Sequence, residues 1–173
     1  MTNRNLILIT LIVVAAFSRL IPHPWNFTAV GAMALFAGAH FRQTWVAVLA
    51  PLAALLLSDL VFGFYPSIVF VYGAFVLTTL VGRYLQDKIS GRRVAGASLV
   101  ASILFFALSN FGVWAMDGMY ARTFEGLVQC YVMAIPFLFN QVAGDLFYSG
   151  VLFGAYALAQ NFVLAKSSAS QQL

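Results

Sequence analysis

The chain has 173 residues, of which 62% are hydrophobic and 8% charged, and its mean hydropathy is +0.92. So few polar side chains cannot cover the surface of a soluble domain, and the composition therefore predicts a protein that lies in a lipid bilayer. Nine Lys and Arg against five Asp and Glu give a formal charge of +4, but the basic residues are dispersed over predicted loops without interleaved aromatic residues, which argues against a nucleic-acid partner.

Apolar segments recur along the whole chain and predict an all-α bundle of six transmembrane helices. Proline punctuates several of them: Pro22 and Pro24 end the first, and Pro51 is expected to kink the third. The first segment also fits a secretory signal peptide with Val14-Ala15-Ala16 as a poor cleavage site, but its near-spanning length favours a helix. The first five expected spans are Asn5 to Ile21, a segment capped by Asn26 or Thr28 and reaching Phe41, Trp45 to Phe64, Ser67 to Tyr84, and Val94 to Trp114.

The last apolar run, Gly126 to Leu164, is too long for one crossing and too short for two. Pro136 offers a solution because proline is tolerated in the first turn of a helix. We therefore expect a short helix over Gly126 to Ile135 at the outer surface and a final span that begins at about Pro136. Residues 1–166 are then a single transmembrane domain, and residues 167–173 are a disordered cytoplasmic tail.

The distribution of basic residues predicts the orientation. Six spans put both termini on one side, and positive charge concentrates in cytoplasmic loops. With the N-terminus inside, Arg19 and Arg122 are the only two of the nine basic residues that lie outside. We therefore expect both termini in the cytoplasm. The segments expected outside are the loop Ser18 to Thr28, the turn at Tyr65 and the segment Ala115 to Ile135. The inner basic residues are then Arg4, Arg42, Arg83, Lys88, Arg92, Arg93 and Lys166.

Two acidic residues fall within predicted spans, where a carboxylate is costly unless it is paired or faces water. Asp59 lies about one turn from the outer boundary, so it either pairs structurally with Arg19 or contacts a ligand. Asp145 is deeper and has no basic residue at its depth, which favours a polar cavity over a dry ion pair. Its expected partners are Asn110, Asn140, Gln141 and Tyr148.

Aromatic and amide side chains gather on the predicted outer side. His23, Trp25 and Asn26 suit ligand recognition by stacking and hydrogen bonding, although a turn with an interfacial aromatic belt explains them too. Because all these side chains lie on the predicted outer side, together they favour a binding site. The predicted ligand-binding residues are Arg19, His23, Trp25, Asn26, Asp59, Tyr65, Asn110, Trp114, Asn140, Asp145 and Tyr148.

No motif indicates an enzyme, because the chain lacks a nucleophile elbow, a zinc-binding His-Glu-x-x-His helix and a Gly-rich phosphate loop. The single cysteine, Cys130, cannot form an internal disulfide. Together with His23 it could bind a soft metal or a corrinoid cobalt, but a buried apolar cysteine is the simpler interpretation. We therefore predict no catalytic residue, no metal and no cofactor.

Several motifs resemble known membrane proteins. The polar first outer loop and the final helix opening at Ala134-Ile135-Pro136-Phe137-Leu138-Phe139-Asn140 resemble the substrate-binding S components of energy-coupling-factor (ECF) vitamin transporters. A closer resemblance, to an uncharacterised family of bacterial membrane proteins related to S components, covers most of the chain. It rests on the motifs Arg19-Leu20-Ile21-Pro22-His23-Pro24-Trp25-Asn26-Phe27-Thr28, Ala29-Val30-Gly31-Ala32, Ser58-Asp59-Leu60 and Gly144-Asp145-Leu146-Phe147-Tyr148.

This resemblance implies a protein of the bacterial cytoplasmic (inner) membrane that binds a vitamin-like molecule from outside, with the first, third and fifth loops as a lid. An ECF coupling protein and ATPases are its implied partners. S components dock through Ala-x-x-x-Ala on the first helix, whereas here Ala15 and Ala16 precede Arg19 and Leu20 by four residues. Either Ala34-x-x-x-Gly38 substitutes or the protein transports alone. A structural or assembly protein whose intramembrane acids only lock helices together is the alternative.

Overall fold

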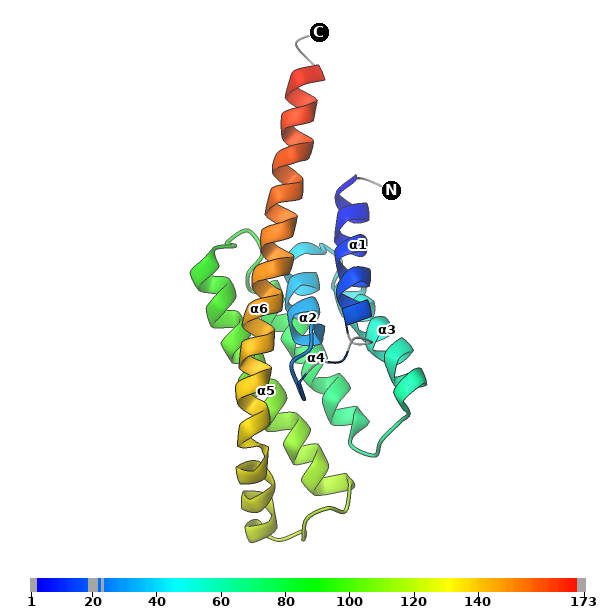
Figure 1. Cartoon of the computed structure of the whole chain (residues 1–173), viewed down its shortest axis with the longest axis vertical. Coiled ribbons are helices and arrows are strands. Elements are labelled where there is room, and N and C mark those ends of the chain that lie inside the picture. Colours follow the sequence, from blue (N-terminus) through cyan, green and yellow to red (C-terminus); the bar gives the residue numbers. More distant parts are fainter. Residues whose placement is uncertain (1–2, 19–21, 23, 171–173) are drawn as a thin grey trace.

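The computed structural model describes residues 3–18, 22 and 24–170, which fold into six α-helices joined by loops (Figure 1). These residues contain no strand, so the all-α prediction is confirmed for them. The helices are α1 (Asn3–Phe17), α2 (Val30–His40), α3 (Thr44–Phe62), α4 (Ile68–Arg83), α5 (Gly91–Met116) and α6 (Phe124–Ser170).

Three helices are long and apolar enough to cross a membrane: α3, α5 and the part of α6 from Phe124 to Phe162. A crossing takes about 20 apolar residues. The other three are apolar but shorter, with 15 residues in α1, 11 in α2 and 16 in α4. Large apolar side chains such as Leu57 and Phe162 are exposed on the outside of the bundle, where lipid would cover them.

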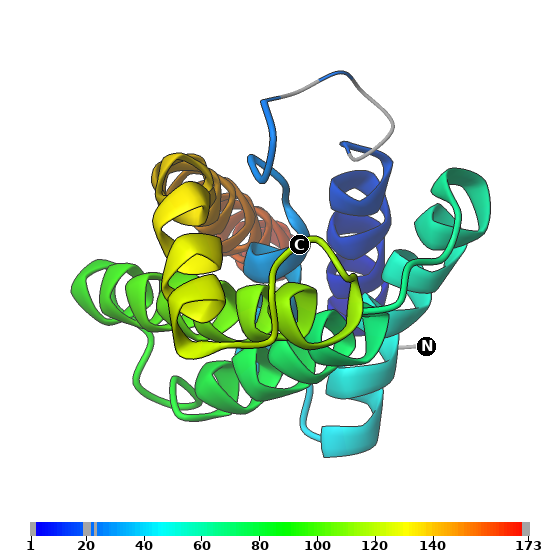
Figure 2. The same cartoon turned by 90° about the horizontal axis from the view of Figure 1, so that it is seen from below.

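The short helix α2 lies in the middle of the bundle, and all its residues are buried. It packs against each of the other five helices, which surround it in the view along the bundle (Figure 2). A Cβ atom at Gly38 would overlap the Thr79 carbonyl, and one at Gly82 would overlap the Leu35 carbonyl, so the backbones of α2 and α4 touch. The absence of a side chain at these two glycines permits this close packing.

The carboxyl end of α2 is held by side chains from two distant parts of the chain. Arg4 donates to the His40 carbonyl at 2.6 Å, and Gln86 donates to the Phe41 carbonyl at 2.9 Å. Arg83 reaches the same Phe41 carbonyl at 3.4 Å. The last carbonyls of a helix lack partners within it, and cations stabilise this end. These contacts explain how a helix of three turns can end inside the bundle.

The predicted break at Pro136 is wrong, because α6 is one helix of 47 residues with Pro136 inside it. Packing against α5 extends to both sides of the proline: the Tyr131 hydroxyl donates to the Ala107 carbonyl at 2.5 Å, and Ser149 bonds to Ser98. Such neighbours make a proline tolerable within a membrane helix. The helix also includes residues 167–170, which were expected to be disordered; residues 171–173 lie outside the described part of the chain.

Helices that follow one another in the chain alternate in direction, so α1 begins and α6 ends at the same end of the bundle (Figure 1). The turns at residues 41–43 and 84–90 lie at this end too. The loops at residues 63–67 and 117–123 lie at the opposite end, which we call the loop end. There the two longest helices, α5 and α6, reach beyond their neighbours.

Candidate functional site

A cavity of about 350 Å³ lies towards the loop end and combines polar and apolar walls. We call it the main cavity. It is bordered by residues of the first loop, the α3–α4 turn, the α5–α6 loop and five helices. Its lining residues are Asn26, Thr28, Val30, Leu55, Tyr65, Ser67, Val71, Phe75, Phe105, Ser109, Asn110, Val113, Asp117, Phe137 and Gln141.

A second space of about 250 Å³ adjoins the main cavity, and we call it the outer hollow. Asn26 and Asn110 line both spaces, as do Val113 and Phe137. Trp25, which is 79% exposed, lines the outer hollow only. The outer hollow also takes Met119, Tyr120, Cys130, Met133 and Ala134.

The first loop is fixed over the cavity by contacts with α6. Asn26 has a φ of 63°, a left-handed conformation that asparagine tolerates better than most residues, and the Phe27 amide closes a turn by donating to the Pro24 carbonyl at 3.0 Å. The absence of a side chain at Gly144 lets α6 approach: a Cβ there would lie 3.1 Å from the Phe27 Cα. The Phe27 ring packs on Tyr148 with the ring centroids 5.6 Å apart. These contacts hold Asn26 and Thr28 at the cavity.

Asp117 joins two walls of the main cavity. One carboxylate oxygen accepts from the Ser67 amide at 3.0 Å, and the other accepts from the Ser67 hydroxyl at 2.9 Å. Ser67 is the N-cap residue of α4, so Asp117 lies at the positive amino end of that helix. The pair ties the α5–α6 loop to the α3–α4 turn.

Two amide side chains are anchored in the cavity wall through their nitrogens. Asn110 Nδ2 donates to the Phe106 carbonyl at 2.7 Å, one turn earlier in α5. Gln141 Nε2 donates to Asp145 Oδ2 at 2.7 Å, one turn later in α6. Fixing each nitrogen also fixes the side to which the amide oxygen points.

Asp145 lies behind the cavity wall and is 1% exposed. Its Oδ2 atom accepts from Gln141 and, at 2.7 Å, from the Ser102 hydroxyl. Its Oδ1 atom has no hydrogen-bond partner among the described residues and lies against Gly31, where a Cβ would overlap it. Asp145 therefore connects α2, α5 and α6 and positions Gln141, which itself lines the cavity.

The family to which the chain belongs follows from its sequence as a whole. The profile of a family of unknown function, DUF6580, matches residues 1–169. The chain belongs to this family. No curated protein and no solved structure matches it.

The structure brings together some of the predicted site residues of this family member. Asn26, Tyr65 and Asn110 line the main cavity, Trp25 lines the outer hollow, and Asp145 contacts the cavity through Gln141. Gln141 was an expected partner of Asp145, and this prediction is confirmed. Arg19 and His23 lie outside the described residues.

Four predicted residues lie apart from both spaces in the described part of the chain. Asp59 is 2% exposed and accepts from the Tyr72 hydroxyl at 3.0 Å. Trp114 donates from Nε1 to the Ala121 carbonyl at 2.9 Å, and Tyr148 packs against Phe27. The fourth, Asn140, is half-buried on α6.

Other cavity residues were not predicted. Asp117 and Ser67 are 50 residues apart in the sequence, and only the fold makes them neighbours. The position of Asp117 in the expected outer segment was the one signal available. The unpredicted polar lining residues are Thr28, Ser67, Ser109, Asp117 and Gln141.

Cys130 and His40, the remaining candidates for metal or proton chemistry, lie in different places. Cys130 is 2% exposed, and its thiol contacts the Asn110 carbonyl with a sulphur–oxygen distance of 3.4 Å. His40, at the far end of α2, packs against the rings of Phe36 and Tyr156, each with a centroid distance of 4.3 Å. Within the described residues, no three His, Cys, Asp or Glu side chains cluster as metal ligands would.

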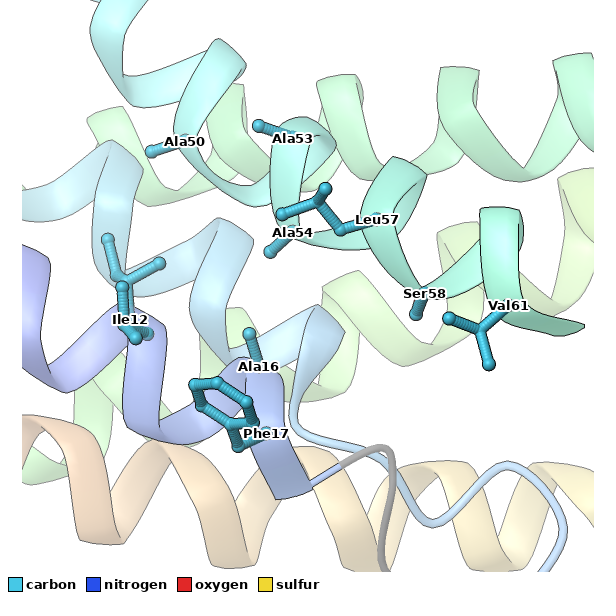
Figure 3. Close-up of a pocket in the computed structure, with 10 residues that line it drawn as sticks. Ile12, Ala16, Phe17, Ala50, Ala53, Ala54, Leu57, Ser58 and Val61 are labelled. Atoms are coloured by element: carbon cyan, nitrogen blue, oxygen red, sulfur yellow. The ribbon is translucent and has the colours of Figure 1, made fainter.

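A groove of about 350 Å³ between α1 and α3 differs from the main cavity in its chemistry (Figure 3). Apart from Ser58, its lining is apolar and includes Ala16, Ala50 and Ala54. The Ser58 hydroxyl is bonded to the Leu55 carbonyl at 2.7 Å within its own helix. Such a surface suits hydrocarbon and has little to orient a polar molecule, so the main cavity is the better candidate for ligand binding.

Proposed function

We propose that this protein is the membrane-embedded binding component of an uptake system for a vitamin-like micronutrient, which it captures at the outer face. The observation that carries the proposal is the main cavity: about 350 Å³, lined by amides, hydroxyls and a carboxylate beside aromatic rings. Small-molecule sites commonly combine an apolar lining with a few placed polar groups in volumes of roughly 300–1,000 Å³. Otherwise the bundle is strongly apolar, so polar groups of this number favour a binding role.

The distribution of charge supports capture from outside. If all six helices cross the membrane, the basic residues Arg42, Arg83 and Lys88 belong to the end of the bundle opposite the cavity. Positive charge favours the cytoplasmic side, so the cavity would face outwards and both termini would lie in the cytoplasm of a bacterial inner-membrane protein. An S-component-like arrangement with an ECF coupling protein and ATPases is compatible with this orientation, and so is a solitary transporter.

The proposal is tested by purifying the protein and quantifying retained small molecules by mass spectrometry. We expect a compound that is stoichiometric with the wild-type protein and reduced about tenfold, a loss of roughly 1.4 kcal/mol, in Asn110→Leu. Leucine is similar in size to asparagine and lacks its polar atoms, and the bond that it removes lies within α5. The matched control is Ala53→Leu, which also adds a leucine but lies in the α1–α3 groove.

The competing function is a structural or assembly role in which the buried acids only lock helices together. It is favoured by one observation, namely that Asp145 joins α5 and α6 through Ser102 and Gln141. This role predicts that the wild-type protein retains no small molecule and that Asn110→Leu and Ala53→Leu behave alike. Equal retention by both variants would therefore refute ligand binding in the main cavity.

A further inference from the structure

Two of the four hydroxyl groups that line the main cavity, those of Ser67 and Ser109, have already donated their protons to the protein. Ser109 donates to the Phe105 carbonyl at 2.7 Å, and Ser67 donates to Asp117 at 2.9 Å. A hydroxyl carries one proton, so once it has donated it offers a ligand only lone pairs. Both serines therefore act towards a ligand as acceptors.

The two anchored amides add to this pattern. Asn110 donates one N–H to the Phe106 carbonyl, and Gln141 donates one N–H to Asp145. The amide oxygens accept no hydrogen bond from the residues that the structure describes. Both side chains line the cavity, so each can present its oxygen there as an acceptor.

The two helix amino ends beside the cavity, which would otherwise attract an anion, are occupied by the protein's own carboxyl groups. Asp145 lies against Gly31 in the first turn of α2, and Asp117 binds Ser67 at the start of α4. Free helix amino ends are the usual seats for phosphate and carboxylate groups. An anionic ligand would have to displace the buried Asp145 side chain or the half-buried Asp117 side chain to use either one.

The remaining electrostatic features of the main cavity favour a positively charged ligand. Asp117 is the one Asp, Glu, Lys, Arg or His among the described lining residues, and a carboxylate has about four acceptor sites, of which Ser67 uses two. The negative carboxyl end of α5 adjoins the cavity at Val113. The rings of Phe75 and Phe105, with centroids 5.1 Å apart, line the same cavity, and aromatic rings attract cations.

From this pattern we infer that the ligand carries a cationic or N–H-rich ring, of the amidine, ammonium or amino-heterocycle class. Asp117 is its counter-ion. Compounds whose polar group is a carboxylate or phosphate are rejected. The inference rests on the proposed function, since it names the class of molecule that the same cavity takes up. Benzamidine, benzamide and benzoate provide a test because they share a ring and differ in charge. Their affinities are measured by calorimetry with the protein in nanodiscs of uncharged lipid.

We expect benzamidine to bind at least tenfold more tightly than benzamide and benzoate to bind most weakly. Asp117→Asn should reduce benzamidine affinity about tenfold, because the new side chain keeps its shape and can still bond Ser67 but loses the charge. The matched control, Asp87→Asn, removes the same charge from an exposed turn at the other end of the bundle, where asparagine tolerates the φ of 60°. It should leave all three affinities unchanged.

A second variant guards against misfolding of Asp117→Asn. Val113→Lys puts a cation four residues before Asp117, close enough to pair with it, and should abolish the preference for benzamidine over benzoate. Tighter binding of benzoate than of benzamidine to the wild-type protein would overturn the inference but leave the proposed function intact. If no probe binds, the charge of the co-purified compound decides: an anion overturns the inference, a cation supports it, and the absence of any compound overturns both proposals.

Discussion

The contact between Gly31 and Asp145 shows how a single missing side chain permits a buried polar group. The carboxyl group occupies the space that a Cβ at position 31 would need, and its Oδ2 atom is bonded to Ser102 and Gln141. The carboxyl group therefore has little room to move. The φ of Gly31 does not lie in the left-handed region, so the backbone conformation does not require glycine here. Glycine is required by the packing between α2 and α6.

Replacing Gly31 with alanine should destabilise the fold, because the added methyl group would push the Asp145 carboxyl group away from its partners. Overpacking of this kind costs about 1–3 kcal/mol. The matched control is Gly154→Ala in α6, where nothing lies within 4 Å of the added Cβ and alanine should stabilise the helix by about 0.5–1 kcal/mol. Thermal unfolding in detergent checks both. A Gly31→Ala midpoint at or above the wild-type value would contradict the packing described for Asp145.

At the scale of the elements, α2 and α6 are opposites: one is 11 residues long and buried, and the other is 47 residues long, with many exposed side chains between Phe124 and Phe162. A helix of 47 residues is about 70 Å long, more than twice a hydrocarbon core of roughly 30 Å. α6 must therefore reach well beyond the bilayer if it crosses it. Its continuity through Pro136 is what gives it this reach.

The continuity of α6 can be measured with spin labels at Val128 and Val151, which are 45% and 49% exposed and lie on either side of Pro136. At 1.5 Å per residue, a continuous helix separates their Cα atoms by about 34 Å. A pair at Phe139 and Val151, both after the proline, is the control and should give about 18 Å. A Val128–Val151 distance well below 30 Å with an unchanged control would show that the helix breaks at the proline.

The accuracy of the sequence predictions differs between elements for physical reasons. The bounds of α3 and α4 were predicted to within about two residues, because Gly63 and Pro66 mark the turn between them and the charged residues Arg42 and Arg83 mark their other ends. The break at Pro136 was wrong, because the local cost of a proline is outweighed by packing along α5, which the sequence does not show. Gln141 was predicted as a partner of Asp145 since the two lie one turn apart on one helix. The Ser102 partner, 43 residues away, depends on tertiary packing.

For the whole molecule, most of the basic side chains and the main cavity lie at opposite ends. Arg4 and Arg83 bond the carboxyl end of α2, while the main cavity lies beyond its amino end. Thus the basic side chains that would orient the protein in a membrane also stabilise its central helix. Removing one of them would be expected to affect both stability and insertion.

The orientation is tested by labelling single cysteines in intact cells with a membrane-impermeant maleimide, in a Cys130→Ala background. Met119, which is 71% exposed at the loop end, should react as Met119→Cys before the cells are permeabilised. Asp87→Cys, in the exposed turn between α4 and α5, should react only afterwards. The reverse pattern would place the cavity on the cytoplasmic side and contradict capture from outside.

The two asparagines that line both the main cavity and the outer hollow have a consequence for the size of a guest molecule. Asn26 and Asn110 border a space of about 350 Å³ on one side and one of about 250 Å³ on the other. A compound of two parts could place its ring in the main cavity and a tail in the outer hollow, with both asparagine side chains contacting the linker between them. Adding a tail that reaches the outer hollow should therefore raise the affinity of a compound for the protein, whereas widening its ring should lower this affinity.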